Sequence, residues 1–403
     1  MFAMPVSTRM REATQRGWIP IRPRRGTQPR VFVFTGANPL RRWPAPQIAR
    51  KHLWPKLKMI VDVNLKASTS GLYADVILPT SSYYERDSLK YSQAYLPYLV
   101  LCEQAVPALG ESKPEWEIFG LLARKIQERS RARGVGRVRD AVGNDVDLST
   151  IYDRWSNGGQ FHESEPRAAL DWILRQTPLT GNRGYDEAKK TGMLPVLEAK
   201  GDHHTLYAVG SDYSPGSTLY PHARFVEHKQ AWPTLSGRQQ FLLDHPWFEQ
   251  DGEALPTHKE PPLAGGSHPL RLTGGHTRWS IHGTWRDSPL MLRLQRGEPC
   301  VWISAPDAHQ RDIADGDRIR VFNDVASFEA VAKVAPAVQP GQAIIYHAWE
   351  SYQFKDHRDS QQLVPAPWKP TQLAGGYGQL HYRAIYNAPG HTPRAQCVDI
   401  APA

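Results

Sequence analysis

The segment Thr273-Gly-Gly-His-Thr-Arg-Trp-Ser-Ile-His-Gly-Thr-Trp-Arg-Asp-Ser-Pro-Leu-Met-Leu-Arg-Leu294 combines histidines, arginines, tryptophans and glycines, and it has little capacity to form a core of its own. His276 and His282 lie six residues apart with Arg278 between them. On an extended strand these three side chains would share one face, because side chains alternate with a period of two. Such a polar row suits a large, flat, anionic ligand. The alternative is a polar barrel rim with ordinarily hydrogen-bonded histidines.

Short apolar runs predict an α/β domain over residues 28–145. Strands are expected at residues 30–35, 58–63 and 75–78, with a helix over residues 46–53. Near-continuous apolar strands with an intervening helix indicate a parallel sheet that is covered on both faces.

Ligands of such sheets bind at the carboxyl ends of the strands. The candidates after the first two strands are therefore Thr35, Gly36, Asn38, Asp62, Ser68 and Thr69. Asp62 ends a strand where an unpaired carboxylate would be costly. It could instead cap the segment that follows.

The middle of the chain predicts packing elements and a long connection. Ser112-Lys-Pro-Glu115 has the capping-box pattern, and the helix after it would place an apolar face on Trp116, Phe119, Leu122, Ala123 and Ile126. A second helix is expected over residues 163–176, with Leu170, Ile173 and Leu174 as its apolar side. Residues 146–267 would form a helical and irregular connection, irregular from residue 181 onward, and residues 1–27 an irregular lead-in.

Residues 268–403 predict a second, all-β domain. Strands are expected at residues 300–304, 318–322, 328–334 and 342–347, with a short helix over 306–311. Closure into a barrel would remove the exposed edges of these strands.

Composition excludes several classes of protein. The 403 residues, 40% of them hydrophobic, suffice for two or three domains. The net charge of +9 is not organised in Lys-rich runs, so nucleic acid is not an expected partner. The sequence contains no run of about 18 apolar residues, so it predicts no transmembrane helix. Cys102, Cys300 and Cys397 lie too far apart to form a paired-cysteine cluster or zinc site.

The segment from Thr273 resembles the start of the C-terminal domain of the molybdopterin oxidoreductases, the dimethyl sulfoxide reductase family. The resemblance is to the branch that holds nitrate reductase alpha chains, selenate and perchlorate reductases, dimethylsulfide dehydrogenase, ethylbenzene dehydrogenase and steroid C25 dehydrogenase. Further blocks agree in the same order: residues 61–65, 68–79 with Glu85, 234–241 with 244–247, 345–350 and 373–379.

The resemblance implies a Rossmann-like, partial α/β domain that binds molybdopterin guanine dinucleotide, followed by a double-psi β-barrel. The expected cofactor is molybdenum bis(molybdopterin guanine dinucleotide). Asp62 would accept hydrogen bonds from its guanine. The residues expected to run along the pterins or face the cofactor are His276, Arg278, Trp279, His282, His347 and Gln379. No catalytic residue and no metal ligand is expected in this chain.

Members of the family are about twice as long, and their N-terminal half carries an iron–sulfur cluster and the protein ligand to molybdenum. The chain therefore resembles the C-terminal portion of a catalytic subunit that shares its cofactor with that half. An iron–sulfur electron-transfer subunit is a further expected partner. The expected reaction is oxygen-atom transfer or hydroxylation coupled to two-electron transfer, of the hydrocarbon or steroid dehydrogenase type or of the nitrate reductase type.

The chain alone is expected to be inactive, and it would act on the periplasmic or the cytoplasmic face of a membrane, with the periplasmic face favoured. The alternative is a module that binds the cofactor or assists assembly without chemistry of its own.

Overall fold

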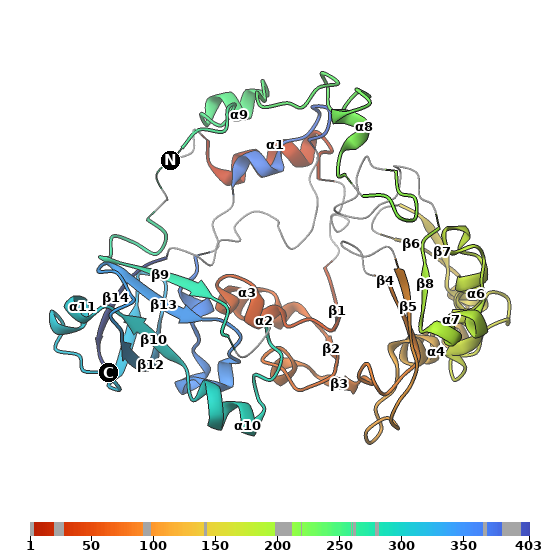
Figure 1. The fold of residues 1–403 in the computed structure, drawn as a ribbon, viewed down its shortest axis with the longest axis horizontal. Helices are drawn as coiled ribbons and strands as arrows, with labels where there is room; N and C mark the ends of the chain where they lie inside the picture. The colour runs from red at the N-terminus through yellow and green to blue at the C-terminus, as the bar shows by residue number, and fades with distance from the viewer. Residues whose placement is uncertain are drawn as a thin grey trace. The chain divides into compact units, whose positions relative to one another are not determined.

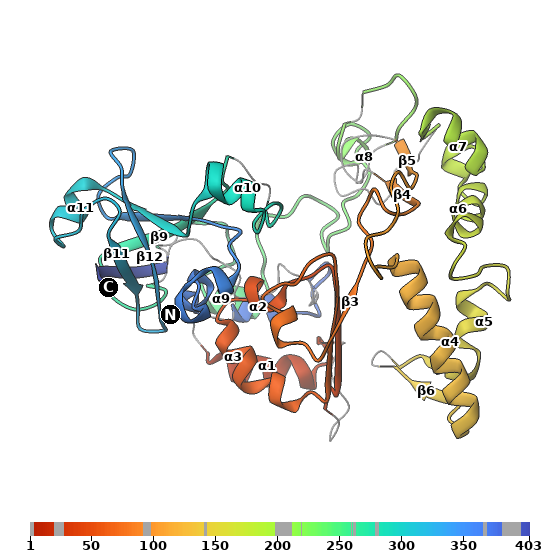
Figure 2. The same ribbon diagram turned by 90° about the horizontal axis from the view of Figure 1, so that it is seen from below.

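The computed structural model describes residues 4–19, 28–91, 98–140, 143–197, 212–218, 220–258, 260, 263–278, 282–365, 369–380 and 396–403. The chain divides into two compact units. Unit 1 comprises Met1–Asp62, Ala67–Ile77 and Phe241–Ala403, and unit 2 comprises Val63–Lys66 and Leu78–Gln240. Figures 1 and 2 show the elements of both. The domain boundaries expected from the sequence stay predictions.

A three-stranded sheet follows the first described segment, in the order β1 (Val31–Thr35), β2 (Met59–Asn64), β3 (Val76–Pro79). The N–H of Asp75 donates to the carbonyl of Ile60 and that of Thr80 to Asn64, so β2 and β3 run parallel. The predicted burial on both faces holds for β2 and is wrong for its neighbours. Only Phe34 of β1 is buried, and no residue of β3 is.

The helices of unit 1 include the predicted one after β1. It is α3 (Pro46–His52), which follows α2 (Pro39–Arg42). The predicted irregular lead-in is wrong where α1 (Val6–Gln15) forms, because one side of this helix is buried. Ala13 packs with Trp247, which lies on α9 (Pro246–Gln250), and α1 and α9 lie close together in Figure 1.

Unit 2 holds an antiparallel sheet and several helices. The sheet has the order β4 (Ser88–Tyr91), β5 (Tyr98–Cys102), β8 (Met193–Pro195). The helices of unit 2 include α4 (Glu115–Arg133), α5 (Ile151–Trp155), α6 (Pro166–Arg175) and α7 (Tyr185–Thr191), which Figure 2 labels. Strand β8 and helix α7 lie where the sequence predicted an irregular connection. They form because Leu194, Ala188 and Tyr185 share a core with Leu101 and Leu174.

The predicted capping box of α4 is wrong, and its predicted apolar face is only partly right, because Ala123 is buried and Trp116 packs against Trp155. The helix begins at Glu115 after Pro114, and Ser112 does not cap it. Phe119, Leu122 and Ile126 are exposed, at 37 to 39% of their surface. The buried side of α4 is instead the one that faces Trp155, whose ring lies 2.6 Å from where a Cβ on Gly120 would stand.

Helix α6 also departs from its prediction. It begins at Pro166 rather than at residue 163, and Ile173 is 43% exposed while Leu174 is fully buried. The spacing of apolar residues correctly predicted that a helix forms here. It wrongly predicted that Ile173 lies on the buried side of the helix.

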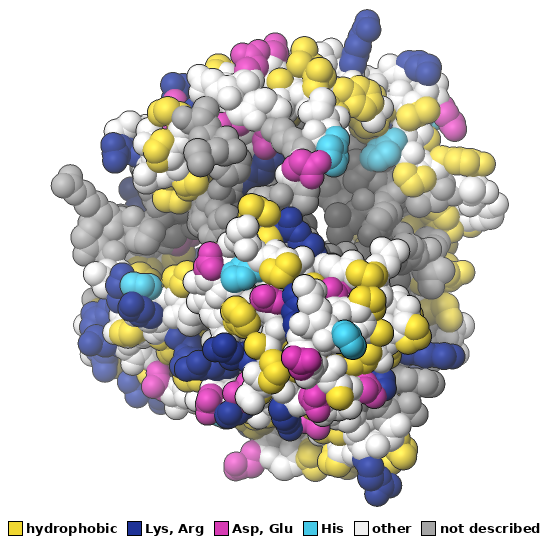
Figure 3. All heavy atoms as spheres, turned by 90° about the vertical axis from the view of Figure 1, so that its left-hand side faces the viewer, with side chains coloured by type: hydrophobic (Ala, Val, Ile, Leu, Met, Phe, Trp, Pro, Cys, Tyr) yellow, Lys and Arg dark blue, Asp and Glu magenta, His cyan; other side chains and the backbone are white. Residues whose placement is uncertain are grey.

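Six strands of unit 1 close into a barrel in the order β10-β12-β11-β14-β9-β13. The strands are β9 (Leu270–Gly275), β10 (Cys300–Ile303), β11 (Arg318–Phe322), β12 (Ser327–Val334), β13 (Gln342–Tyr346) and β14 (Gln396–Pro402). Alternating side chains, such as Phe328, Ala330 and Ala332 on β12, fill the interior. The predicted barrel is confirmed. On its surface, Lys and Arg side chains are scattered among Asp and Glu side chains (Figure 3).

Short elements complete the described chain: β6 (Arg137–Arg139), β7 (Asp145–Asp147), α8 (Ala223–Val226), α10 (Pro289–Met291), the π-helix Leu292–Arg296, α11 (Ala305–His309) and the 3-10 turns Trp54–Lys56, Gly71–Tyr73, Leu148–Thr150, Pro178–Thr180, Ser351–Gln353, Lys355–His357, Ser360–Leu363 and Pro370–Leu373. Among the residues that the structure describes, no helix combines the length and the apolar character needed to span a membrane.

Candidate functional site

A buried carboxylate joins the barrel to the loops after β1 and β2. Glu350 is completely buried. Its oxygens accept hydrogen bonds from the side-chain amide of Asn38 at 2.9 and 3.0 Å. They also accept from the backbone N–H of Thr69 at 2.7 Å and from its hydroxyl at 2.5 Å. The Nε of Arg286 lies 2.5 Å away and supplies the compensating charge. Three donor groups and one cation make this buried charge tolerable.

The two strand-end loops are tied to each other by the same residues. Asn38 follows the turn at Gly36, where φ is +57°, and its side-chain oxygen accepts from the N–H and the hydroxyl of Ser70. The Ser70 hydroxyl in turn accepts from the N–H of Leu40 at 2.8 Å. The predicted candidates Asn38 and Thr69 are thus brought together, as expected for parallel strands whose carboxyl ends meet at one edge.

Asp62 lies on β2, and its side chain contacts the loop that follows this strand. It is fully buried, and its Oδ2 accepts from the hydroxyl of Ser68 at 3.2 Å. That hydroxyl also accepts from the N–H of Gly71, and a Cβ on Gly71 would stand 2.7 Å from the Asp62 carboxylate. Asp62 and Ser68 therefore shape the turn after β2. The guanine contact expected of Asp62 stays a prediction.

A cavity of about 340 Å³ opens beside this cluster, between α2 and the ends of β9 and β13. Arg41 and Arg42 line it with positive charge, and Gly274 and Gly275 line it with backbone. The Nε of Arg41 donates to the carbonyl of Trp349 at 2.6 Å. Burial lowers the pKa of Arg41, and the Glu350 carboxylate opposes that effect. The remaining lining residues are Leu272, Thr273, His276, His282, Ile345, His347, Ser360, Gln361, Val364 and Gln396.

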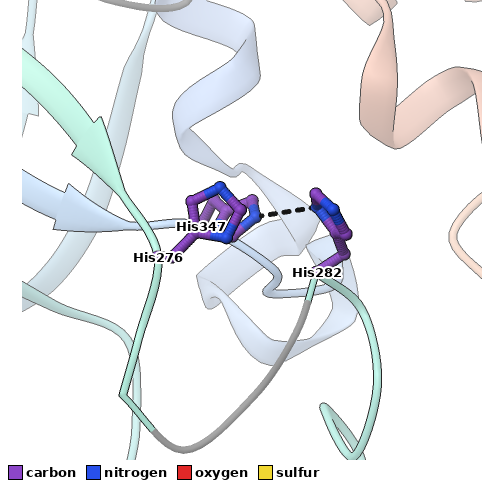
Figure 4. Close-up of side chains that lie close together, drawn as sticks. All are labelled: His276, His282 and His347. Atoms are coloured by element: carbon purple, nitrogen blue, oxygen red, sulfur yellow. Dashed lines mark hydrogen bonds between the residues drawn. The ribbon is translucent and has the colours of Figure 1, made fainter. Parts of the chain in front are cut away.

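Three histidines converge at the rim of this cavity (Figure 4). The ring centroids of His276 and His347 are 4.2 Å apart, and those of His276 and His282 are 5.0 Å apart. The Nε2 of His347 lies 3.4 Å from the Nδ1 of His282. Burial, with His276 and Arg41 nearby, lowers the pKa of His347 to about 4. His347 is therefore a neutral imidazole at pH 7.

The expected single strand through both histidines is wrong. Strand β9 ends at Gly275, whose carbonyl accepts from the N–H of His347, and the chain then turns away. His282 has a φ of +48°, and it meets His276 across a loop rather than along a strand face. Arg278 is exposed and does not line the cavity. Trp279 lies outside the described residues.

The remaining predicted residues lie in turns or at the end of a strand, and they do not line the cavity. Thr35 and Gly36 are exposed at the end of β1. Gln379 is half-buried in the turn where Tyr377 pairs with Leu380. Glu85 accepts from the N–H of Ser82 within a turn.

Sequence reasoning missed Glu350, Arg41 and Arg286 as members of the site. A carboxylate directly after the apolar residues Ala348 and Trp349 was a usable signal for Glu350, since an acid in such a place needs partners. Nothing in the sequence pairs it with Asn38, 312 positions away.

Comparisons with known proteins agree with this architecture. Residues 23–125 match the family described as molybdopterin oxidoreductase, and residues 270–379 match the molydopterin dinucleotide binding domain. The chain is 40% identical over 384 residues to the respiratory nitrate reductase subunit alpha of Haloferax mediterranei, which covers 91% of this chain and 38% of that protein. It is 33% identical over 386 residues to the perchlorate reductase subunit alpha of Dechloromonas aromatica, covering 96% of this chain and 40% of that one.

A solved structure shares the fold. The acetylene hydratase from Pelobacter acetylenicus matches with a TM-score of 0.56 and 15% identity, over 93% of this chain and 44% of its own. Most of the barrel thus lies in the region that matches a molydopterin dinucleotide binding domain. The chain belongs to the molybdopterin oxidoreductases, within the dimethyl sulfoxide reductase family. It spans about two fifths of the length of the curated relatives named above.

Proposed function

We propose that this chain is the C-terminal portion of the catalytic subunit of a molybdenum oxidoreductase and holds part of a bis(molybdopterin guanine dinucleotide) cofactor. The observation that carries the proposal is the cavity between α2 and the barrel, where Arg41, Arg42 and three histidines meet in the regions that both family descriptions match.

The chemistry of the lining residues fits such a cofactor. The guanidinium groups of Arg41 and Arg42 offer charge and directed donors to phosphate oxygens. Gly274 and Gly275 carry no side chains that would hold a flat ring system away from the backbone. The neutral imidazole of His347 can donate at one nitrogen and accept at the other.

When bound, the cofactor supplies oxygen-atom transfer coupled to two-electron transfer. The residues of this chain would bind it, orient it and adjust its electronics. Imidazoles beside a conjugated ring change local charge and hydrogen bonding, both of which tune a cofactor. Glu350 would act indirectly, because its contacts with Thr69 and Asn38 hold the cavity wall in place.

The proposed substrate class is an oxyanion of the nitrate type, since relatives named as nitrate and perchlorate reductases align over most of this chain. A hydrocarbon or steroid dehydrogenase is the second candidate. Its motivation is the sequence of residues 346–354, which differs from the nitrate reductase pattern.

The further proposed partners are an N-terminal half with the iron–sulfur cluster and an iron–sulfur electron-transfer subunit. The proposed location is the periplasmic side of a membrane.

Replacing both His276 and His282 by alanine tests the proposed role of the cavity. In the assembled enzyme, we expect a shift in the molybdenum reduction potential or a loss of molybdopterin while the barrel stays folded. Unchanged potential and unchanged cofactor content in this double variant would remove the claim made for these histidines. A matched control is His309→Ala, since His309 is exposed at the end of α11 and does not line the cavity.

A further inference from the structure

The three histidines at the cavity rim have a geometry that their hydrogen bonding does not explain. The 3.4 Å between the Nε2 of His347 and the Nδ1 of His282 exceeds the range of about 2.7–3.2 Å that N–H···O hydrogen bonds have. Ring nitrogens of His276, His282 and His347 all lie within 4.8 Å of one another. Among the residues that the structure describes, these three histidines form a group of side chains that could hold a metal ion.

We infer that His276, His282 and His347 form a binding site for a divalent transition metal ion in the cofactor-free chain. Two imidazole nitrogens that each lie about 2.05 Å from a tetrahedral zinc ion are about 3.3 Å apart. The observed separation of 3.4 Å matches that edge. The ring of His276 is exposed and lies beside that of His347, with the two ring centroids 4.2 Å apart.

The electronic requirements of such a site are met as well. Metal binding needs neutral imidazoles, and an imidazole of ordinary pKa, about 6.5, is mostly neutral at pH 7. Three imidazoles suit Zn²⁺, Cu²⁺, Ni²⁺ or Co²⁺ better than Mg²⁺ or Ca²⁺. Two of the ligands are exposed, which gives an ion a route to the site. Three protein ligands leave a fourth position for water or an anion.

The positive charge of Arg41 opposes a bare cation at this place. Arg41 and Arg42 line the same cavity, so an anion in the fourth position of the metal would face them. The site therefore suits a metal ion together with an anionic ligand.

Bound metal would link three segments of unit 1: the residue after β9, the loop that carries His282 and the residue after β13. The inference does not depend on the proposed function. If that function holds, metal and cofactor would use the same imidazoles and would exclude each other.

The test is a titration of the purified, molybdopterin-free 403-residue chain with Co²⁺ and then with Zn²⁺. We expect one equivalent of Co²⁺ to give the intense visible absorption of tetrahedral coordination, and Zn²⁺ to abolish it. His282→Asn should weaken binding at least about tenfold, since loss of a partner that only orients a ligand already costs that much. Asparagine tolerates the φ of +48° at this exposed position, so the variant should fold.

His309→Ala is the matched control and should bind Co²⁺ like the unmodified chain. Absence of the tetrahedral band in the unmodified chain would overturn the inference. So would a band of equal intensity and affinity in the His282→Asn and His347→Ala variants, because the metal would then lie elsewhere. Cofactor content plays no part in this experiment, so its outcome is separate from that of the proposed function.

Discussion

Glu350, which follows strand β13 of the barrel, accepts hydrogen bonds from both the backbone N–H and the hydroxyl of Thr69, which follows strand β2, at 2.7 and 2.5 Å. These residues are 281 positions apart in the chain. Glu350 also accepts from Asn38, which follows β1, so it holds the loops after both β1 and β2 against the barrel. The cavity of the proposed cofactor site lies beside these contacts. The shape of the site therefore depends on a fully buried carboxylate that lies outside the cavity lining.

Glu350→Gln should destabilise the chain by about 3–5 kcal/mol, because it leaves Arg286 without its charged partner and disturbs the donors of Asn38 and Thr69. Urea unfolding monitored by tryptophan fluorescence measures this. The control is Glu329→Gln, whose carboxylate pairs with the exposed Lys355 and should change stability by about 1 kcal/mol or less. Equal effects of the two substitutions would contradict the role given to Glu350.

Asp359 predicts a pH dependence of stability. Burial raises its pKa to about 7, well above its ordinary value of 3.8. Between these values the folded state holds a proton that the unfolded state has lost, so the contribution of Asp359 to stability falls as pH rises from about 4 to about 7. Asp359→Asn keeps an oxygen for the N–H of Gln361 and removes the titration.

The stability advantage of this variant over the unmodified chain should therefore grow between pH 4 and pH 8, by up to about 4 kcal/mol. Urea unfolding at both pH values measures the difference. An advantage that does not change with pH would show that Asp359 is ionised in the folded protein throughout the range.

His347 titrates in the opposite sense. Its pKa is lowered to about 4, chiefly by burial, from an ordinary value of 6.5. The folded state therefore binds fewer protons than the unfolded state between these values, and its stability falls as pH drops from about 6.5 to about 4. NMR of labelled histidines should show His347 neutral at pH 5.5, where a histidine of ordinary pKa is mostly protonated. A His347 ring that is protonated at pH 5.5 would contradict its desolvated placement.

The isolated 403-residue chain should show no reductase or dehydrogenase activity. The reason is that the protein ligand to molybdenum and the nearest electron relay are expected in the part of the relatives that this chain does not match. Dye-linked assays with nitrate and with perchlorate measure this. A turnover of about 1 per second or more would refute the proposed division of the site.

Much of the barrel could be predicted from local sequence. Strand β11 has the bounds that were expected, residues 318–322, and β12 differs from its prediction by one residue. These strands alternate between interior and surface, and the turns between them are marked by glycine, asparagine or aspartate. Such signals are local, so a single sequence is enough to find them.

The failures share a physical cause, which is that packing partners distant in sequence override local patterns. The apolar spacing on α4 was real, but Gly120 fits closely against Trp155 and turns Phe119 toward solvent. The histidine pair was found, but its strand geometry was not, because β9 ends where its pairing with β13 ends. Glu350 was missed as a site residue because its partners come from other parts of the chain.

The most direct test of the central claim is the content of molybdopterin guanine dinucleotide in the assembled enzyme with Arg42→Gln, compared with Arg50→Gln. Arg42 lines the proposed cofactor cavity, whereas Arg50 lies on the neighbouring α3 and lines a different one. Loss of one charged hydrogen bond to phosphate should reduce cofactor affinity by about tenfold or more in the Arg42 variant, and Arg50→Gln should leave it unchanged. Equal cofactor content and affinity in the two variants would contradict the assignment of this cavity to the dinucleotide.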